Sequence, residues 1–291
     1  MRVKHLSKKI HQKEILSDID FEVKSGSIVG IIGRNGAGKT TLLRTMTGIL
    51  NPTKGDVLLE EESIFKNPKL KEYIIFVPDS SEALKSYSTA EILTIYKSIY
   101  PRFDEKYFHE LMERFSLTSV DKIEKYSKGM KALFSLVIAF STRAKYVILD
   151  EPTDGLDVIA KKQILKILVE EVAVHDVSII ISSHRLDELE FMANDIVLIR
   201  NGKVDGHYEL DTMKGLYKKA QVVFQEYMPE VFKNHVTVLN QTGRVYTVII
   251  DMNDKKMEEL LKQHQPLLYE ELPISLEDVF VAKLGGDEFV S

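Results

Sequence analysis

Short runs of apolar residues recur along residues 1–200. Each run has the length of a strand, and most show no polar alternation, which is typical of strands buried on both faces of a sheet. The runs that we predict as strands lie at residues 27–32, 73–77, 146–149, 178–182 and 196–199. Helical patterns separate them, notably at residues 40–48 and 157–174. Strands that alternate with helices predict an α/β fold with a mostly parallel sheet.

Other segments depart from this alternation. Residues 80–142 predict a helix-rich insertion, in which Ser88 and Glu91 have the spacing of a capping box. The Asn201-Gly202 pair predicts a two-residue hairpin turn, and we place the end of the first domain near residue 210. Residues 211–291 then predict a small α+β appendage. Its expected elements are strands at 220–225, 236–239 and 245–250 and helices near 254–264 and 275–284.

The composition narrows the possible functions. With 39 Lys and Arg against 44 Asp and Glu, the net charge is −5, whereas nucleic-acid-binding proteins usually carry a basic excess. The absence of cysteine excludes disulfides, thiolate catalysis and Cys-ligated metal sites. The longest stretch without a charged residue, 132–142, has 11 positions, too few to span a membrane as a helix. Because the first residues hold no apolar signal-peptide core, we expect a cytosolic protein.

A glycine-rich segment follows the first predicted strand. Residues 33–40 (GRNGAGKT) match the phosphate-loop pattern G-x-x-x-x-G-K-[ST], and the strand before and helix after disfavour a plain glycine turn. In such a loop, backbone N–H groups converge on a phosphate, Lys39 bridges the β- and γ-phosphates, and Thr40 binds magnesium. The residues predicted to bind the nucleotide are Gly33, Arg34, Asn35, Gly36, Ala37, Gly38, Lys39, Thr40 and Thr41.

Two adjacent carboxylates end the predicted strand at 146–149. In phosphate-loop enzymes an acid at a neighbouring strand tip holds the metal, so Asp150 is the candidate magnesium ligand. Glu151 is then free to act as the general base that polarises the attacking water. An isolated Asp-Glu pair is usually a pair of solvated loop charges. The preceding strand and the phosphate loop favour the catalytic interpretation here.

The order of these motifs resembles that of the ATP-binding cassette (ABC) ATPases, which are phosphate-loop NTPases. The signature of that family, usually LSGGQ, corresponds to residues 126–130 (YSKGM), a variant similar to that of ABC-2-type exporters. The resemblance implies that this segment contacts ATP held by the opposite subunit. Without the flanking motifs, the serine would be only a helix N-cap. The residues given this role are Ser127, Lys128, Gly129 and Met130.

The resemblance extends to further segments of the chain. Residues 155–157 (GLD) match the D-loop, although Asp157 could equally cap the following helix. His184, just after the strand at 178–182, matches the switch histidine that contacts the γ-phosphate and Glu151. Taken alone, a histidine at a strand end would more often be a polar surface residue. The family fold also implies an antiparallel N-terminal β subdomain, and residues 276–280 resemble the C-terminal segment of ABC-2-type ATPases.

Two positions differ from the family pattern. The family places a magnesium-binding glutamine after the strand equivalent to 73–77, but here Asp79 takes that register. Asp79 keeps an oxygen ligand and adds negative charge beside the metal. The aromatic residue that stacks on adenine is also missing, and alignment brings Ile10 or His11 to its place. We therefore predict that adenine is either held more weakly or is contacted by His11.

The resemblance implies an ATP hydrolase that needs ATP and Mg²⁺ and works as a dimer with a second ABC ATPase subunit. The predicted function is to power a membrane exporter of a peptide, a drug or similar cargo, through a separate transmembrane permease that docks near residues 79–87. The protein would then be cytoplasmic and peripheral on the inner face of the cell membrane, without a nucleic-acid partner. The alternative is a soluble ABC-type ATPase that acts on ribosomes or chromosomes, which the single phosphate loop and the acidic balance disfavour.

Overall fold

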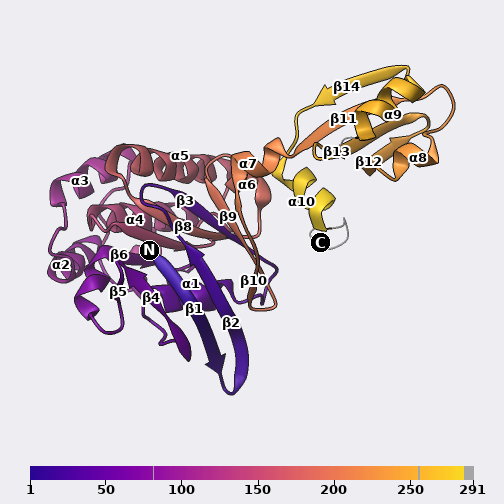
Figure 1. Ribbon diagram of the computed structural model, residues 1–291. Coiled ribbons are helices and arrows are strands. Elements are labelled where there is room, and N and C mark those ends of the chain that lie inside the picture. The colour runs from indigo at the N-terminus through magenta and orange to yellow at the C-terminus, as the bar shows by residue number, and fades with distance from the viewer. Residues whose placement is uncertain (81, 255, 285–291) are drawn as a thin grey trace. The chain divides into compact units, whose positions relative to one another are not determined.

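The computed structural model describes residues 1–80, 82–254 and 256–284 of the chain (Figure 1). The chain forms two compact units, Met1–His207 and Tyr208–Ser291. Every candidate site residue named above lies in the first unit. The two units are therefore described separately, beginning with the first.

A six-stranded sheet forms the centre of the first unit, with strand order β10-β9-β3-β8-β7-β6. From β9 to β6, neighbouring strands are parallel, which confirms the predicted sheet. Every residue of β3 and β8 is buried, as expected for strands covered on both faces. The strands are β3 (Ile28–Ile32), β6 (Ile74–Val77), β7 (Tyr146–Asp150), β8 (Ser178–Ser183), β9 (Asp195–Arg200) and β10 (Lys203–Glu209).

A second sheet, antiparallel and of order β2-β1-β4-β5, shares one hydrophobic core with the central sheet. The buried side chains Leu42 and Leu43 of α1 (Lys39–Met46) belong to this core, together with Leu16 of β2 and Ile148 of β7. The antiparallel N-terminal β subdomain that the family resemblance implied is therefore present. Its strands are β1 (Arg2–Ile10), β2 (Lys13–Glu22), β4 (Lys54–Leu59) and β5 (Glu62–Ser63).

The segment between β6 and β7 is helical, as predicted. The capping box of its first helix is present, because the Ser88 hydroxyl accepts from the Glu91 N–H and the Glu91 carboxylate accepts from the Ser88 N–H. The helices are α2 (Thr89–Ile99), α3 (Glu105–Arg114) and α4 (Lys128–Ser141); α5 (Val158–His175) and α6 (Leu186–Glu190) follow β7 and β8. Short 3-10 helices lie at Pro68–Tyr73, Glu82–Leu84 and Ile123–Lys125.

The parallel register brings the carboxyl ends of β3, β7 and β8 together. Ile32 of β3 pairs with Ser183 of β8, and Asp150 of β7 pairs with Ser182. Three loops that are far apart in sequence therefore start at one edge of the sheet. They carry the phosphate loop, Glu151 and His184.

The second unit is built on an antiparallel sheet of order β12-β13-β11-β14. One face packs against Phe232 of α8 and Met257 of α9. The capping pair of α10 is present, since Ser275 and Asp278 exchange hydrogen bonds of 2.8 and 3.1 Å. The strands are β11 (Tyr217–Val223), β12 (Val236–Thr242), β13 (Val245–Asp251) and β14 (Leu268–Leu272), and the helices are α7 (Leu210–Gly215), α8 (Glu230–Lys233), α9 (Lys256–His264) and α10 (Leu276–Leu284).

The predictions for this unit did not include α7, α8 or β14, and they placed β11 at other bounds. The strand expected at 220–225 is β11, which starts earlier because Lys218 and Lys219 hide its beginning from a hydrophobic pattern. The pattern also did not predict β14, whose sequence LYEEL has no buried residue. An exposed edge strand is held by backbone pairing rather than by apolar burial, so its side chains give little signal.

A buried carboxyl group joins the helical insertion to α5. Glu171 is 2% exposed, its Oε1 accepts a hydrogen bond from the Tyr107 hydroxyl of α3, and its Oε2 is buried without a partner among the described residues. Burial raises the pKa of Glu171, while the Tyr107 hydroxyl and the Arg143 and Arg114 guanidinium groups oppose the rise. The protonated carboxyl is therefore favoured more strongly in the folded state than in the unfolded chain.

We predict that ionisation of Glu171 weakens the fold. Its contribution is fully present below its ordinary pKa of 4.5 and is lost as the pH rises through the higher folded value, by about 1.4 kcal/mol for each pH unit between the two. Glu171→Gln should flatten this part of the profile of unfolding free energy against pH, measured by urea denaturation. Glu170→Gln is the control: Glu170 is the neighbouring residue and pairs with Arg114, and this variant should keep the pH dependence of the unfolding free energy. An unchanged slope in Glu171→Gln would contradict the assignment.

Candidate active site

The phosphate-loop residues turn sharply between β3 and α1. Gly36 and Gly38 have φ values of 82° and 106°, in the left-handed region that side chains disfavour. A Cβ on Gly33 would lie 2.5 Å from the carbonyl oxygen of Ile199. Gly38 is the N-cap of α1 and brings no capping side chain, so the first N–H groups of the helix are left for an external acceptor. This geometry suits an anion such as a phosphate.

The Lys39 side chain points back into the turn. Its ammonium donates to the carbonyl oxygen of Gly33 at 2.7 Å and lies 3.4 Å from Oε1 of Glu151. Lys39 is only 5% exposed, so the contact with Glu151 is shielded from water. The structure therefore places the predicted phosphate-binding cation beside the predicted general base.

Asp150 and Glu151 are both held by Ser182 of the neighbouring strand. The Ser182 hydroxyl donates to Oδ1 of Asp150 at 2.7 Å and accepts from the backbone N–H of Glu151 at 3.0 Å. Asp150 is 2% exposed, whereas Glu151 has a φ of 45° and turns its side chain out of the strand. One hydroxyl thus fixes the Asp150 carboxylate and the backbone from which the Glu151 side chain leaves.

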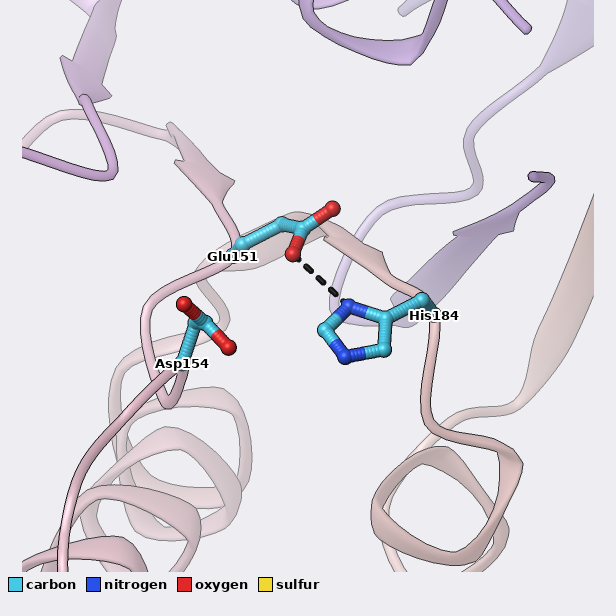
Figure 2. Close-up of side chains that lie close together, drawn as sticks. All are labelled: Glu151, Asp154 and His184. Atoms are coloured by element: carbon cyan, nitrogen blue, oxygen red, sulfur yellow. Dashed lines mark hydrogen bonds and ion pairs between the residues drawn. The ribbon is translucent and has the colours of Figure 1, made fainter. Parts of the chain in front are cut away.

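His184 and Asp154 complete a compact group around Glu151 (Figure 2). The Nδ1 atom of His184 lies 2.8 Å from Oε2 of Glu151, and one ligand atom from each of the three residues lies within 4.8 Å of the others. Glu151 therefore has a cationic or hydrogen-bonding partner at each carboxylate oxygen: Lys39 at Oε1 and His184 at Oε2. This arrangement fixes the rotamer of the candidate base.

The signature residues lie at the start of α4, beside the D-loop. Ser127 is the N-cap of α4 and accepts from the N–H of Met130 at 3.2 Å. A Cβ on Gly129 would lie 3.1 Å from that of Ala160 in the first turns of α5, and one on Gly155 would lie 2.3 Å from the Lys128 ammonium. Asp157 caps α5 as expected. Ser127 and Lys128 are exposed.

Two hollows lie next to Glu151, and the predicted site residues are divided between them. The smaller, of about 190 Å³, is lined by the phosphate loop, Ile15 and Glu151. The larger, of about 420 Å³, is lined by Asp79, Lys128 and Asp154 among others, and also by Glu151. The signature residues do not line the hollow of the phosphate loop in their own chain. Glu151 contributes to both hollows.

Three residues around this site were not predicted from the sequence: Ser182, Asp154 and Ile15. Ser182 was only part of a predicted strand, although a serine at the buried end of an apolar strand is an available signal. Ile15 lines the smaller hollow, where the family pattern had pointed to His11. His11 lies in the exposed turn between β1 and β2, with a φ of 45°, and does not line that hollow. Its contact with adenine stays a prediction.

Comparison with known proteins identifies the family. The ABC transporter family matches residues 16–154. The ABC transporter ATP-binding protein YtrB of Bacillus subtilis (strain 168) is 36% identical over 287 residues, which cover 98% of each chain. The chain belongs to the ABC transporter ATP-binding proteins. The bacitracin transport ATP-binding protein BcrA of Bacillus licheniformis is 30% identical over 97% of this chain and 96% of its own.

The fold agrees with this assignment. A solved structure described as an ATP binding subunit of ABC transporter superposes with a TM-score of 0.66 at 27% identity, over 74% of this chain and 91% of its own. This ABC ATPase therefore binds and hydrolyses ATP as a transporter subunit. Among the residues that the structure describes, no helix is both long and apolar enough to cross a membrane.

Proposed function

We propose that this ABC ATPase hydrolyses MgATP at sites shared between two chains and thereby powers a membrane exporter. The observation that carries the proposal is the position of Glu151, between Lys39 of the phosphate loop and His184 of the neighbouring strand end. A carboxylate beside a phosphate loop, oriented by a histidine, has the position that the general base of ATP hydrolysis requires.

The residues near the phosphate loop fit a magnesium ion. Magnesium prefers oxygen ligands and needs few of them from the protein. Thr40 supplies a hydroxyl, and the buried Asp150 carboxylate is fixed through its Oδ1 by Ser182. Asp79 lines the larger hollow and not that of the phosphate loop, so its contact with magnesium stays a prediction from the family pattern. The bound ion would neutralise part of the charge on the phosphates.

Nucleotide binding would redistribute the charges around Glu151. Lys39 now contacts the Glu151 carboxylate, and triphosphate oxygens in the smaller hollow would compete for the same ammonium. Glu151 would then be released from Lys39, while its contact with His184 still orients it toward the attacking water. The base would become available when its substrate has bound.

The signature residues support a site made by two chains. Ser127 and Lys128 are exposed, and they do not line the phosphate-loop hollow of their own chain. The hydroxyl of Ser127 and the N–H groups at the very start of α4 could meet a γ-phosphate bound to a partner. In a symmetric pair, each of the two ATP molecules would then complete the contact between the chains. A homodimer and a heterodimer with a second ABC ATPase both satisfy this geometry.

The export function rests on relatives and on sequence. BcrA is named as a bacitracin transport protein, and the YSKGM signature is similar to that of ABC-2-type exporters. A peptide or a drug is therefore the proposed class of cargo. A separate transmembrane permease would hold the protein at the cytoplasmic face of the membrane, in contact with residues near Tyr87, which is 42% exposed. The relatives give no support to the ribosome or chromosome alternative.

The catalytic part is tested by Glu151→Gln. Loss of the general base should reduce turnover by about 10²- to 10⁴-fold, while ATP still binds and holds two chains together. ATPase rates and size-exclusion chromatography with MgATP measure the two effects. Glu110→Gln, the same change at an exposed position of α3, is the control and should leave both unchanged. Normal turnover in Glu151→Gln would exclude Glu151 as the base.

The shared site is tested by mixing two inactive variants. Lys39→Ala removes the phosphate-binding cation, and Ser127→Asp keeps an N-cap residue on α4 but sets a carboxylate against the γ-phosphate. A mixed dimer has one site with both native residues, so an equal mixture should recover about a quarter of the wild-type rate for random pairing. Each variant alone should stay inactive. A mixture that is no more active than its components would contradict a site made by two copies of this chain.

The partner is tested by affinity purification of the protein from its native membranes. A polytopic membrane protein should co-purify, and Tyr87→Asp should reduce its recovery at least severalfold, because a charge in a buried interface is costly. Tyr227→Asp, which changes a 73% exposed tyrosine of the second unit, is the matched control. Recovery of ribosomal subunits or DNA in place of a membrane protein would favour the alternative function.

A further inference from the structure

A hollow of about 480 Å³ lies in the second unit, between α9 and the ends of three strands. Its walls come from Ile250 of β13, Met257 and Leu261 of α9, and Tyr269 of β14. All four belong to the hydrophobic core of this unit or pack against it. The hollow is therefore an opening into the core, with a size within the range of about 300–1,000 Å³ that is usual for small-molecule sites.

The lining is apolar and adaptable at its base. Ile250 and Met257 are 4% and 3% exposed, while Leu261 and Tyr269 are partly buried. Met252, at the rim, adds a second methionine that is 47% exposed. Thioether side chains fit ligands of different shapes and pack well on aromatic rings. An apolar group of moderate size is the part of a ligand that these walls would take.

Two of the three described charged residues that line the hollow carry carboxylates. Asp251 and Asp254 line it, and the Asp254 carboxylate contacts Nδ1 of His235 at 2.5 Å. That contact and the backbone N–H of Lys256 lower the pKa of Asp254, so this group is ionised at neutral pH. The Lys218 ammonium also lines the hollow, but Glu271 lies 2.6 Å from it and offsets its charge. The lining therefore has an excess of carboxylate charge.

We propose that this hollow binds a small amphipathic cation, with its apolar or aromatic part against Met257, Leu261 and Tyr269 and its ammonium group near Asp251. Burial of the apolar part supplies most of the affinity, and the carboxylates select the sign of the charge. All of the lining residues belong to the second unit, and none belongs to the ATP site. The appendage would thus carry a ligand site of its own.

Three probes that share a phenylbutyl group test the preference for charge: 4-phenylbutylamine, 4-phenylbutanol and 4-phenylbutyrate. Isothermal titration calorimetry of the full-length protein should show the amine binding about two- to fivefold tighter than the alcohol, as a solvent-accessible ion pair allows, and the carboxylate binding weakest. Asp251→Asn should reduce the advantage of the amine and leave the affinity for the alcohol unchanged. Equal affinities for the amine and the carboxylate, or no binding of the amine, would overturn the proposal.

Variants that fill the hollow locate the binding. Leu261→Trp should abolish binding of the amine. Met252→Trp, at a half-exposed position, should weaken that binding at least tenfold, and it is the deciding variant if Leu261→Trp does not fold. Val231→Trp is the control, because Val231 is 54% exposed on α8 and does not line the hollow. Lys39→Ala should bind the amine normally, whatever its effect on ATP hydrolysis. Binding that survives both filling variants would place the ligand elsewhere and overturn the assignment.

Discussion

The contact between Lys39 and Glu151 joins the two parts of the chain on which the active site depends. Lys39 begins the helix after β3, Glu151 follows β7, and β8 lies between these two strands. The side chains can meet at 3.4 Å only because the strands are parallel and end at the same edge of the sheet. A shift in register would move Glu151 away from Lys39 and leave a buried ammonium without its carboxylate.

The same sheet edge explains why the chain holds only part of the proposed catalytic site. The phosphate loop, Glu151 and His184 come from adjacent strand ends, whereas Ser127 begins a helix of the insertion next to the D-loop. Glu151 lines both hollows, the one at the phosphate loop and the one beside α4. A carboxylate in that position borders both the phosphate loop and the hollow lined by Asp79 and by Lys128 of α4. Such a position suits an enzyme in which hydrolysis is coupled to the state of its partners.

The electrostatics of the molecule differ between its two units. In the first unit, each buried charge near the site has a defined partner: Lys39 has Glu151, and Asp150 has the Ser182 hydroxyl. In the second unit, Asp251, Asp254 and Lys218 are the described charged residues that line an apolar opening. Paired buried charges hold a site in one geometry, whereas charges at the rim of a hollow mainly select the ligand that enters it. The two units therefore suit different kinds of recognition.

The sequence alone determined the class of fold and the chemistry of the main site. Continuous apolar runs identified the buried parallel strands, and the phosphate loop and the Asp150-Glu151 pair followed from short motifs, because local spacing fixes what a backbone turn or a strand end can present. Only the tertiary structure decided that Ser182 holds the Asp150 carboxylate and the Glu151 backbone N–H, that Ile15 rather than His11 lines the phosphate-loop hollow, and that β14 forms an edge of the sheet in the second unit. These features depend on contacts between segments distant in sequence, and exposed or polar residues leave no periodic signal of such contacts.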